Sequence, residues 1–368
     1  MSTPRPVSSE DDPLAGLGAA LAQIAAGAAA RDSQPEPEFP HQAFEALKLA
    51  GALRFNARPG PARPPAREEL ALVRRVAGAD GSVGRIFDGH LNAVERIAVQ
   101  GPPGLRDREL GFVLAGESLA GVWGGDPVPG EGPPASVVVS DGGPVLRGVK
   151  TFCSGAGGLH RALVLGRDPD GGPPISAWID LTDTRRVEID RSWYRSRGLV
   201  ASVSHRVVFH DAPVLAQLGP PGAIAAQPWF GRDALRTAAS WAGMADTAVT
   251  DALQTLAQRP RRGELEALAA GRILAAQHTI NVWMDAAAAA MDAAGADLPQ
   301  VSLHARVAIA DACRELLAEA ARACGSRPFA TAAPLDRARR DLEVFLLQHR
   351  LDPLLARAGG AALEGMEP

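Results

Sequence analysis

The chain has 368 residues, of which 46% are hydrophobic and 22% charged, and its formal net charge is −4. These values are ordinary for a globular protein with one large domain or two to three small ones. The slight negative charge gives no reason to expect a nucleic acid or an anionic membrane as partner. No stretch reaches the roughly 18 uninterrupted apolar residues of a membrane helix. Three cysteines without metal-ligand spacing predict a reducing, cytoplasmic location and no metal site.

The first third of the chain is predicted to be helical after a disordered tail. Residues 1–13 are polar and lack the apolar core of a secretion signal. Apolar residues at helical spacing, separated by proline and glycine clusters, then predict helices over residues 14–31, 42–51, 68–79, 83–99 and 105–115. We therefore expect an N-terminal helical domain over residues 14–116.

From residue 117 the chain changes to short β-rich runs separated by Gly, Pro and Asp turns. These runs predict strands over residues 136–139, 144–150, 161–165, 176–180 and 204–210. The sequence Asp211-Ala212-Pro213 is expected to close this region. Residues 117–224 are therefore predicted to form a small antiparallel β domain.

The remainder, residues 225–368, is predicted to be helical. Helical spacing and glycine or proline stops predict four long helices over residues 231–258, 264–293, 303–324 and 334–357. Long antiparallel helices joined by short loops form a four-helix bundle. The pattern by itself predicts an α+β fold that is rich in helix.

One segment carries more information than any other. Residues 146–156 read Leu-Arg-Gly-Val-Lys-Thr-Phe-Cys-Ser-Gly-Ala and include Lys150, which with Lys48 makes up the chain's lysines. Arginine does not reproduce the compact ammonium of a lysine, so an isolated lysine in an arginine-rich chain is a candidate for a specific role. The pattern Leu-x-Gly-x-Lys-x-aromatic-x-Ser-x-Ala resembles the flavin-facing β segment of the acyl-CoA dehydrogenase family. The order helical domain, β domain and four-helix bundle is also similar to the fold of that family.

This resemblance implies a flavin site built from two segments. In the family, the aromatic residue and the hydroxyl residue lie against the isoalloxazine ring, and an upstream turn meets its pyrimidine edge. The implied cofactor-binding residues are Trp123, Gly124, Asp126, Phe152, Cys153 and Ser154. Trp123 is expected either to stack on or border the cofactor or to be a plain hydrophobic turn residue. Cys153 is also consistent with a small buried apolar side chain.

Two departures from the family's pattern qualify the expected chemistry. The Arg-x-x-Phe-Gly motif that helps hold the adenosine end of FAD is missing after Arg259, so FAD is expected with FMN as the alternative. His349 stands where the family carries its catalytic glutamate, and helical spacing places it on the apolar face of Leu342 and Phe345. It is expected to be either the catalytic acid or base or a core histidine bonded to a backbone carbonyl. His90 is expected at the wall of the substrate pocket.

The resemblance implies a flavin-dependent oxidoreductase acting on the CH–CH group of an acyl thioester or another small organic substrate. A flavin-dependent monooxygenase of the same fold is the first alternative, because the altered turn and His349 depart from the dehydrogenase pattern. A non-catalytic member kept as an interaction partner is the second. The family assembles through its bundle, and the small-residue stretches Arg236–Gly243 and Ala286–Ala294 suit close packing, so a homodimer or homotetramer is expected.

Overall fold

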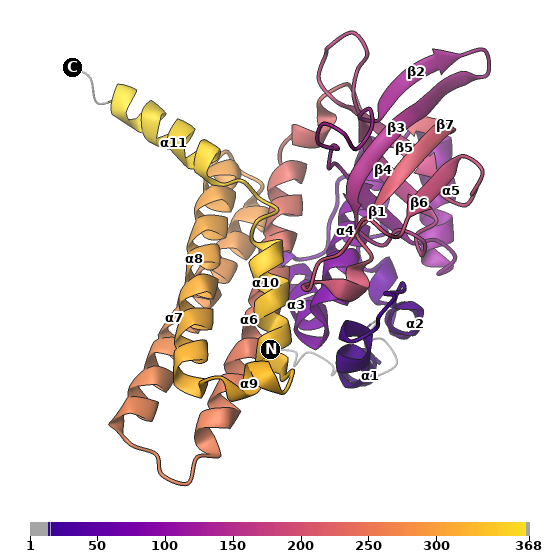
Figure 1. The fold of residues 1–368 in the computed structure, drawn as a ribbon. Helices are drawn as coiled ribbons and strands as arrows, with labels where there is room; N and C mark the ends of the chain where they lie inside the picture. The colour runs from indigo at the N-terminus through magenta and orange to yellow at the C-terminus, as the bar shows by residue number, and fades with distance from the viewer. Residues whose placement is uncertain (1–13, 15, 366–368) are drawn as a thin grey trace, which may run out of the picture. The chain divides into compact units, whose positions relative to one another are not determined.

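The computed structural model describes residue 14 and residues 16–365, so the predicted disordered tail lies outside the described residues. Helices precede and follow a central β sheet along the chain, which gives an α+β fold (Figure 1). The chain forms two compact units. Unit 1 contains Met1–Pro64, Gly89–Tyr194 and Ala201–Ala223, and unit 2 contains Pro65–Asp88, Arg195–Val200 and Ile224–Pro368. The three-domain division drawn from the sequence stays a prediction.

Unit 1 holds the sheet. Its strands are β1 (Ala120–Trp123), β2 (Ser136–Ser140), β3 (Gly143–Cys153), β4 (Arg161–Gly166), β5 (Ile175–Asp180), β6 (Val187–Asp190) and β7 (His205–Gln217). Within the described chain the order is β1-β4-β5-β7-β3-β2, with β6 paired to β7. Adjacent strands are antiparallel except β1 and β4. The helices of this unit are α1 (Leu17–Asp32), α2 (His41–Leu49), α5 (Pro103–Leu114) and, from Gly89 on, α4 (Gly81–Gln100).

The strand predictions were confirmed in part. The predicted runs each overlap a strand, although Ser204 lies one residue before β7. Strands β1 and β6 were missed because each has only four residues. The expected end at Asp211 was wrong: β7 continues to Gln217 and pairs first with β3 and then with β5. Asp211 adopts a φ of 54°, so the backbone kinks there without leaving the sheet.

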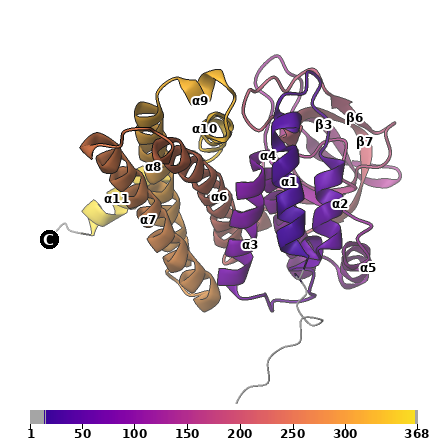
Figure 2. The same ribbon diagram turned by 90° about the horizontal axis from the view of Figure 1, so that it is seen from below.

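Unit 2 is a helical bundle. It consists of α3 (Ala66–Ala79), α6 (Trp229–Ala257), α7 (Glu264–Ala293), α8 (Leu298–Cys324), α9 (Arg327–Ala330), α10 (Pro334–Phe345) and α11 (Asp352–Glu364), together with the first residues of α4. Figures 1 and 2 show α6, α7, α8 and α10 side by side. Small residues let the backbones approach: a Cβ added to Gly243 on α6 would meet the carbonyl of Arg74 on α3. Residues Arg236–Gly243 are all buried, so this stretch packs inside the subunit and cannot be the predicted oligomer face.

The predicted helix over residues 334–357 is two helices. The first, α10, ends at Phe345, and α11 begins at Asp352 with Pro353 in its first turn. Proline disfavours a continuing helix before it and suits a first turn, so the Leu351-Asp352-Pro353 sequence starts a new helix. His349 therefore lies in the connection and not on a helix face. Among the described residues, no helix is long and apolar enough to cross a membrane.

Candidate functional site

Lys150 holds the predicted cofactor segment to the upstream turn. Its side chain is 1% exposed, and its Nζ donates to Asp126 Oδ1 at 2.7 Å and to the Gly124 carbonyl at 3.4 Å. Arg167 donates to the other oxygen of the same carboxylate at 3.0 Å. Partial burial raises the pKa of Asp126, but the hydrogen bonds and charges of Lys150 and Arg167 lower it further, and the net pKa lies below its usual range. The isolated lysine is thus explained by an ion pair between its buried ammonium and the exposed carboxylate of Asp126, which positions the turn.

The turn itself approaches strand β3 closely. Thr151 N donates to the Gly125 carbonyl at 2.9 Å, and a Cβ added to Gly125 would lie 2.5 Å from the carbonyl oxygen of Thr151. Trp123 is 1% exposed and donates its indole Nε1 to the Ser154 carbonyl at 3.0 Å. The indole N–H is therefore used within unit 1, where it ties the turn to the segment that ends at Ser154.

Phe152 is the exposed member of this segment. The pairing of β3 with β7 is irregular between Lys150 and Cys153, and Phe152 adopts a φ of 53°. Its ring is 59% exposed and lies edge-on to Trp193, with centroids 4.9 Å apart. A positive φ at a bulky residue is strained and is retained where the surroundings require it. The result is an aromatic surface left open on the sheet.

Ser154 begins a chain of hydroxyl groups. Its Oγ lies 2.9 Å from Ser204 Oγ, which lies 2.8 Å from Ser202 Oγ, and all three residues are buried. Ser202 and Ser204 are not among the site residues expected from the sequence. The neighbouring Cys153 is fully buried, and burial raises the pKa of its thiol. Cys153 is therefore an unreactive apolar side chain.

A cavity of about 710 Å³ lies in unit 1. Its apolar wall includes Phe44, Trp123 and Leu159, and its charged lining includes Lys48 and Arg191. Cavities of roughly 300–1,000 Å³ with an apolar wall and a few polar groups are typical of small-molecule sites. Trp123 thus belongs both to this cavity and to the predicted cofactor segment.

His90 is bonded to backbone groups through both ring nitrogens, and its expected place at the wall of the substrate pocket stays a prediction. It is completely buried, its Nε2 lies 2.8 Å from the Leu53 carbonyl, and its Nδ1 accepts from Ala120 N at 3.2 Å. Burial lowers the pKa of His90 to about 4. Both ring nitrogens are occupied by backbone groups, so His90 has no polar atom left for a substrate and fastens α4 to strand β1.

His349 lies in unit 2, half-buried against the bundle. Its ring is edge-on to Trp241 with centroids 5.5 Å apart, and its Nδ1 is 3.4 Å from Arg306 Nη1. A guanidinium has only donors, so Nδ1 is the acceptor and the neutral ring carries its hydrogen on Nε2. Burial, followed by the charges of Arg306 and Arg85, lowers the pKa of His349 to about 3. Desolvation and two guanidinium groups thus disfavour the protonated ring.

A second polar group in unit 2 was missed by sequence reasoning. Arg85 Nη1 donates to Asp88 Oδ1 at 2.7 Å, Ser240 Oγ donates to Asp88 Oδ2 at 3.1 Å, and the Arg85 guanidinium lies 5.4 Å from the centre of the Phe345 ring. Burial raises the pKa of Asp88 despite these donors. In the sequence, Arg85 and Asp88 are a pair of opposite charges within an apolar helical pattern. That pattern does not indicate Ser240 on α6 as the partner of Asp88.

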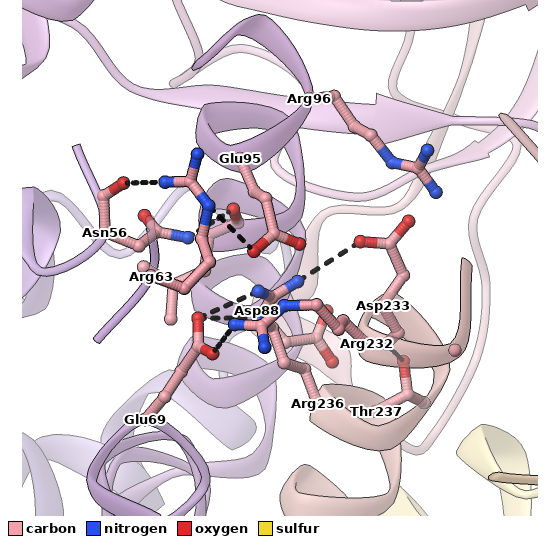
Figure 3. A network of polar contacts seen from close by, with 12 residues as sticks. Asn56, Arg63, Glu69, Asp88, Glu95, Arg96, Arg232, Asp233, Arg236 and Thr237 are labelled. Atoms are coloured by element: carbon pink, nitrogen blue, oxygen red, sulfur yellow. Dashed lines mark hydrogen bonds and ion pairs between the residues drawn. The ribbon is translucent and has the colours of Figure 1, made fainter. Parts of the chain in front are cut away.

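Arg63, Arg232 and Arg236 pair with carboxylates (Figure 3). In unit 2, Glu69 accepts from Arg232 at 2.7 Å and from Arg236 at 2.9 Å, and these ion pairs join α3 to α6. In unit 1, Arg63 and Glu95 are 3.6 Å apart at their closest nitrogen and oxygen. These pairs are structural, because each charge is balanced within its own unit.

Comparison with known proteins places the fold. No protein-family model matches the chain. A dibenzothiophene monooxygenase from Mycolicibacterium goodii is 29% identical over 171 residues, and the match covers 42% of this chain. The match covers 39% of that enzyme's length, so this chain spans only about two-fifths of the relative.

Three solved structures are similar over nearly the full chain. The dibenzothiophene monooxygenase TdsC from Paenibacillus sp. A11-2, bound to FMN, has a TM-score of 0.84 at 18% identity and covers 97% of this chain and 98% of its own. Methanesulfinate monooxygenase MsuC from Pseudomonas fluorescens has a TM-score of 0.80 at 22% identity, with coverages of 97% and 98%. KijD3, in complex with FMN and a dTDP-linked amino sugar, has a TM-score of 0.80 at 22% identity, with coverages of 97% and 95%. The chain therefore has the acyl-CoA dehydrogenase-like α+β fold that the sequence predicted, with helical regions on both sides of a central, mostly antiparallel sheet.

Proposed function

We propose that this protein is a flavin-dependent monooxygenase acting on a small organic substrate. The observation that carries this proposal is the state of His349. A dehydrogenase needs a base that removes a proton from its substrate, and such a base works best with a pKa near the working pH. His349 has a pKa of about 3 and already accepts a hydrogen bond from Arg306 at Nδ1. It is suited to donate a hydrogen bond from Nε2 and unsuited to remove a proton.

The similar proteins support the same choice. The curated relative and two of the three solved structures are named as monooxygenases. Their names specify an aromatic sulfur compound and a sulfinate, and neither is an acyl thioester. The monooxygenase alternative therefore replaces the dehydrogenase as the preferred function, and an acyl-thioester substrate has no support from these relatives.

The residues of unit 1 fit a flavin. The exposed ring of Phe152 beside Trp193 offers an aromatic surface to a planar cofactor, and the hydroxyl chain that begins at Ser154 offers polar groups next to it. Lys150 and Asp126 hold this arrangement in place. When bound and reduced, a flavin supplies the electrons with which molecular oxygen is activated and one oxygen atom is transferred to the substrate.

We favour FMN over the FAD that was first expected. The motif that holds the adenosine end of FAD is missing after Arg259, and Arg259 donates instead to Glu266 at 2.8 Å, where it braces the start of α7. FMN is also the flavin present in the TdsC and KijD3 structures. The chain's own contribution to FMN binding is to orient the cofactor through Phe152 and Ser154.

We further propose that the protein is a homo-oligomer. Helix α7 exposes four large apolar side chains, Leu265, Leu268, Leu274 and Val282, with exposures between 47% and 78%. Apolar side chains in this number on one helix are typical of an interface. Sedimentation velocity at micromolar concentration should give a dimer or tetramer, and a monomer at that concentration would contradict the proposal.

The function is tested by binding and by isotope incorporation. FMN titrated into the purified protein should lose fluorescence with saturable binding, and reduced FMN with ¹⁸O₂ and dibenzothiophene or methanesulfinate as probe should give a product containing one ¹⁸O atom. Reduction of bound flavin by an acyl thioester, with no ¹⁸O incorporated into either probe, would support the dehydrogenase. A protein that binds neither FMN nor FAD would support the non-catalytic alternative.

A further inference from the structure

Arg306 is a buried cation with no acidic partner among the described residues. It lies on α8 and is 4% exposed, and its Nε donates to the carbonyl of Ser302, one turn earlier, at 2.9 Å. Its Nη1 donates to His349 Nδ1 at 3.4 Å. Over residue 14 and residues 16–365, no carboxylate forms an ion pair with it. The lowering of the Arg306 pKa to about 10 has burial as its cause, with no compensating negative charge.

This state is costly and differs from the other buried arginines of unit 2. Taking a charge out of water costs several kcal/mol unless a partner compensates it, and buried charges are therefore normally paired. Arg232 and Arg236 follow this rule through Glu69. The exception at Arg306 indicates a negative charge that the described chain does not supply.

The side chains around Arg306 offer donors. Because Nδ1 of His349 accepts from Arg306, Nε2 of that ring carries a hydrogen. Trp241, whose ring His349 contacts edge-on, is completely buried, and its Nε1 has no hydrogen-bond partner among the described residues. A guanidinium, an imidazole N–H and an indole N–H are complemented by a group rich in acceptors. A compact oxyanion meets this requirement, since its paired oxygens match the fork of the guanidinium.

We propose that Arg306, assisted by His349, binds an oxyanion of the substrate, a carboxylate or a sulfinate. This inference rests on the proposed function and specifies its substrate class. It assigns Arg306 to substrate selection and explains why His349 is held neutral: a protonated ring beside the guanidinium would add a second uncompensated charge. A neutral analogue of the same shape leaves the guanidinium unpaired and is rejected for that reason.

The test compares anions with neutral analogues of the same shape. Binding of benzoate against benzamide, and of methanesulfinate against dimethyl sulfoxide, is measured by tryptophan fluorescence and thermal shift in the absence of turnover. We expect the wild-type protein to bind at least one anion at least about tenfold more tightly than its neutral analogue. Arg306→Met should abolish this preference. Arg314→Met removes an arginine of the same helix that pairs with Asp311 at 2.6 Å, and it should leave the preference intact.

Stability separates substrate binding from a structural role. Replacing an uncompensated buried charge by an apolar side chain of similar length should leave the melting temperature unchanged or raise it. A melting temperature that falls markedly in Arg306→Met would show that the guanidinium is a structural group and would overturn the inference. Arg306→Lys, which keeps the positive charge, is the second test: the loss of the planar fork should weaken anion binding about tenfold.

The remaining outcomes each decide the question. Equal binding of anion and neutral analogue by the wild-type protein, or an unchanged preference in Arg306→Met, would refute the inference. Dissociation of an oligomer by Arg306→Met without an effect on anion binding would show that a second copy supplies the negative charge, and would also refute it. FMN titration of each variant keeps the two proposals apart: intact FMN binding without anion preference rejects the substrate class alone, whereas absent FMN binding in the wild-type protein rejects the proposed function.

Discussion

Lys150 in unit 1 and Arg306 in unit 2 are both almost completely buried cations, with exposures of 1% and 4%. Lys150 has a carboxylate at 2.7 Å in Asp126, whereas Arg306 meets a backbone carbonyl and a neutral imidazole. The first is balanced inside the protein and therefore positions a turn. The second is unbalanced and therefore indicates a ligand. The comparison teaches that the partner of a buried charge, more than its burial, distinguishes a structural cation from a binding one.

The largest effect on stability is expected at Lys150, the buried cation that pairs with Asp126. Lys150→Met should lower the free energy of unfolding by about 1–3 kcal/mol, because it removes the buried ammonium that donates to Asp126 and to the Gly124 carbonyl, while Asp126 keeps its pair with Arg167. Lys150→Arg should also destabilise, since the larger guanidinium does not fit the site of the ammonium. Urea denaturation followed by circular dichroism measures the change.

The chain offers a matched control in its other lysine. Lys48 pairs with Glu45 at 3.6 Å, and its side chain is 39% exposed. Lys48→Met should change the free energy of unfolding by less than about 1 kcal/mol. Equal effects at the two lysines would remove the structural role assigned to Lys150.

The next largest effect is expected at His349, which accepts a hydrogen bond from Arg306. If His349 acts as a hydrogen-bond donor, His349→Ala should lower turnover by roughly 10²-fold, whereas His349→Gln should stay within about tenfold of wild type, since its amide still donates. The assay uses the first substrate for which oxygen incorporation is detected. Losses of roughly 10²-fold in both variants would restore His349 as the acid or base, and unchanged rates in both would return it to a packing role.

The pH dependence of the free energy of unfolding tests the same contrast on a buried histidine without hydrogen-bond partners among the described residues. His205 in unit 1 is 2% exposed, and neither ring nitrogen has a partner among the described residues. Burial, with Arg191 nearby, lowers the pKa of His205 to about 4 from 6.5. The unfolded chain therefore takes up a proton between these two values while the folded chain does not. Stability from this source is fully present above pH 6.5 and is lost as the pH falls toward 4.

His205→Leu should remove the loss of stability that His205 causes as the pH falls. Between pH 7 and pH 5 the free energy of unfolding of the variant should fall by about 2 kcal/mol less than that of the wild type. His210 is an exposed histidine that pairs with Glu188 at 2.9 Å, and His210→Asn serves as the control. A pH dependence of His205→Leu that equals the wild type would show that the imidazole is not protonated on unfolding in this range.

The smallest effect tests the cofactor segment. Ser154→Ala removes a hydroxyl that lies 2.9 Å from Ser204 Oγ, and loss of a buried hydrogen bond costs about 1–3 kcal/mol. FMN binding, followed by fluorescence quenching, should therefore weaken by about tenfold. Ser140 bonds to the Gly143 carbonyl at an exposed turn, and Ser140→Ala should bind FMN as the wild type does. Equal FMN affinity in the Ser154 variant would exclude its hydroxyl from the cofactor site.

Local patterns in the sequence predicted what short-range physics controls. The bounds of α7, Glu264–Ala293, follow from helical spacing and a glycine before its start, and the structure has the same bounds. The segment around Lys150 was identified from the rarity of lysine and from a resemblance to a known flavin-facing strand. Both signals are contained within a few neighbouring residues.

Only the tertiary structure decided the chemistry of His349. Its pKa and tautomer depend on Arg306, which lies 43 residues away along the chain, and on Arg85 in a different helix. A helical pattern predicts which residues share a face, but helix α10 ends at Phe345 and does not extend to residue 349. Desolvation and Coulomb interactions act through space, so the charge state of a buried group is set by whichever segments the fold packs around it. The absence of a carboxylate beside Arg306 is likewise a property of the folded chain.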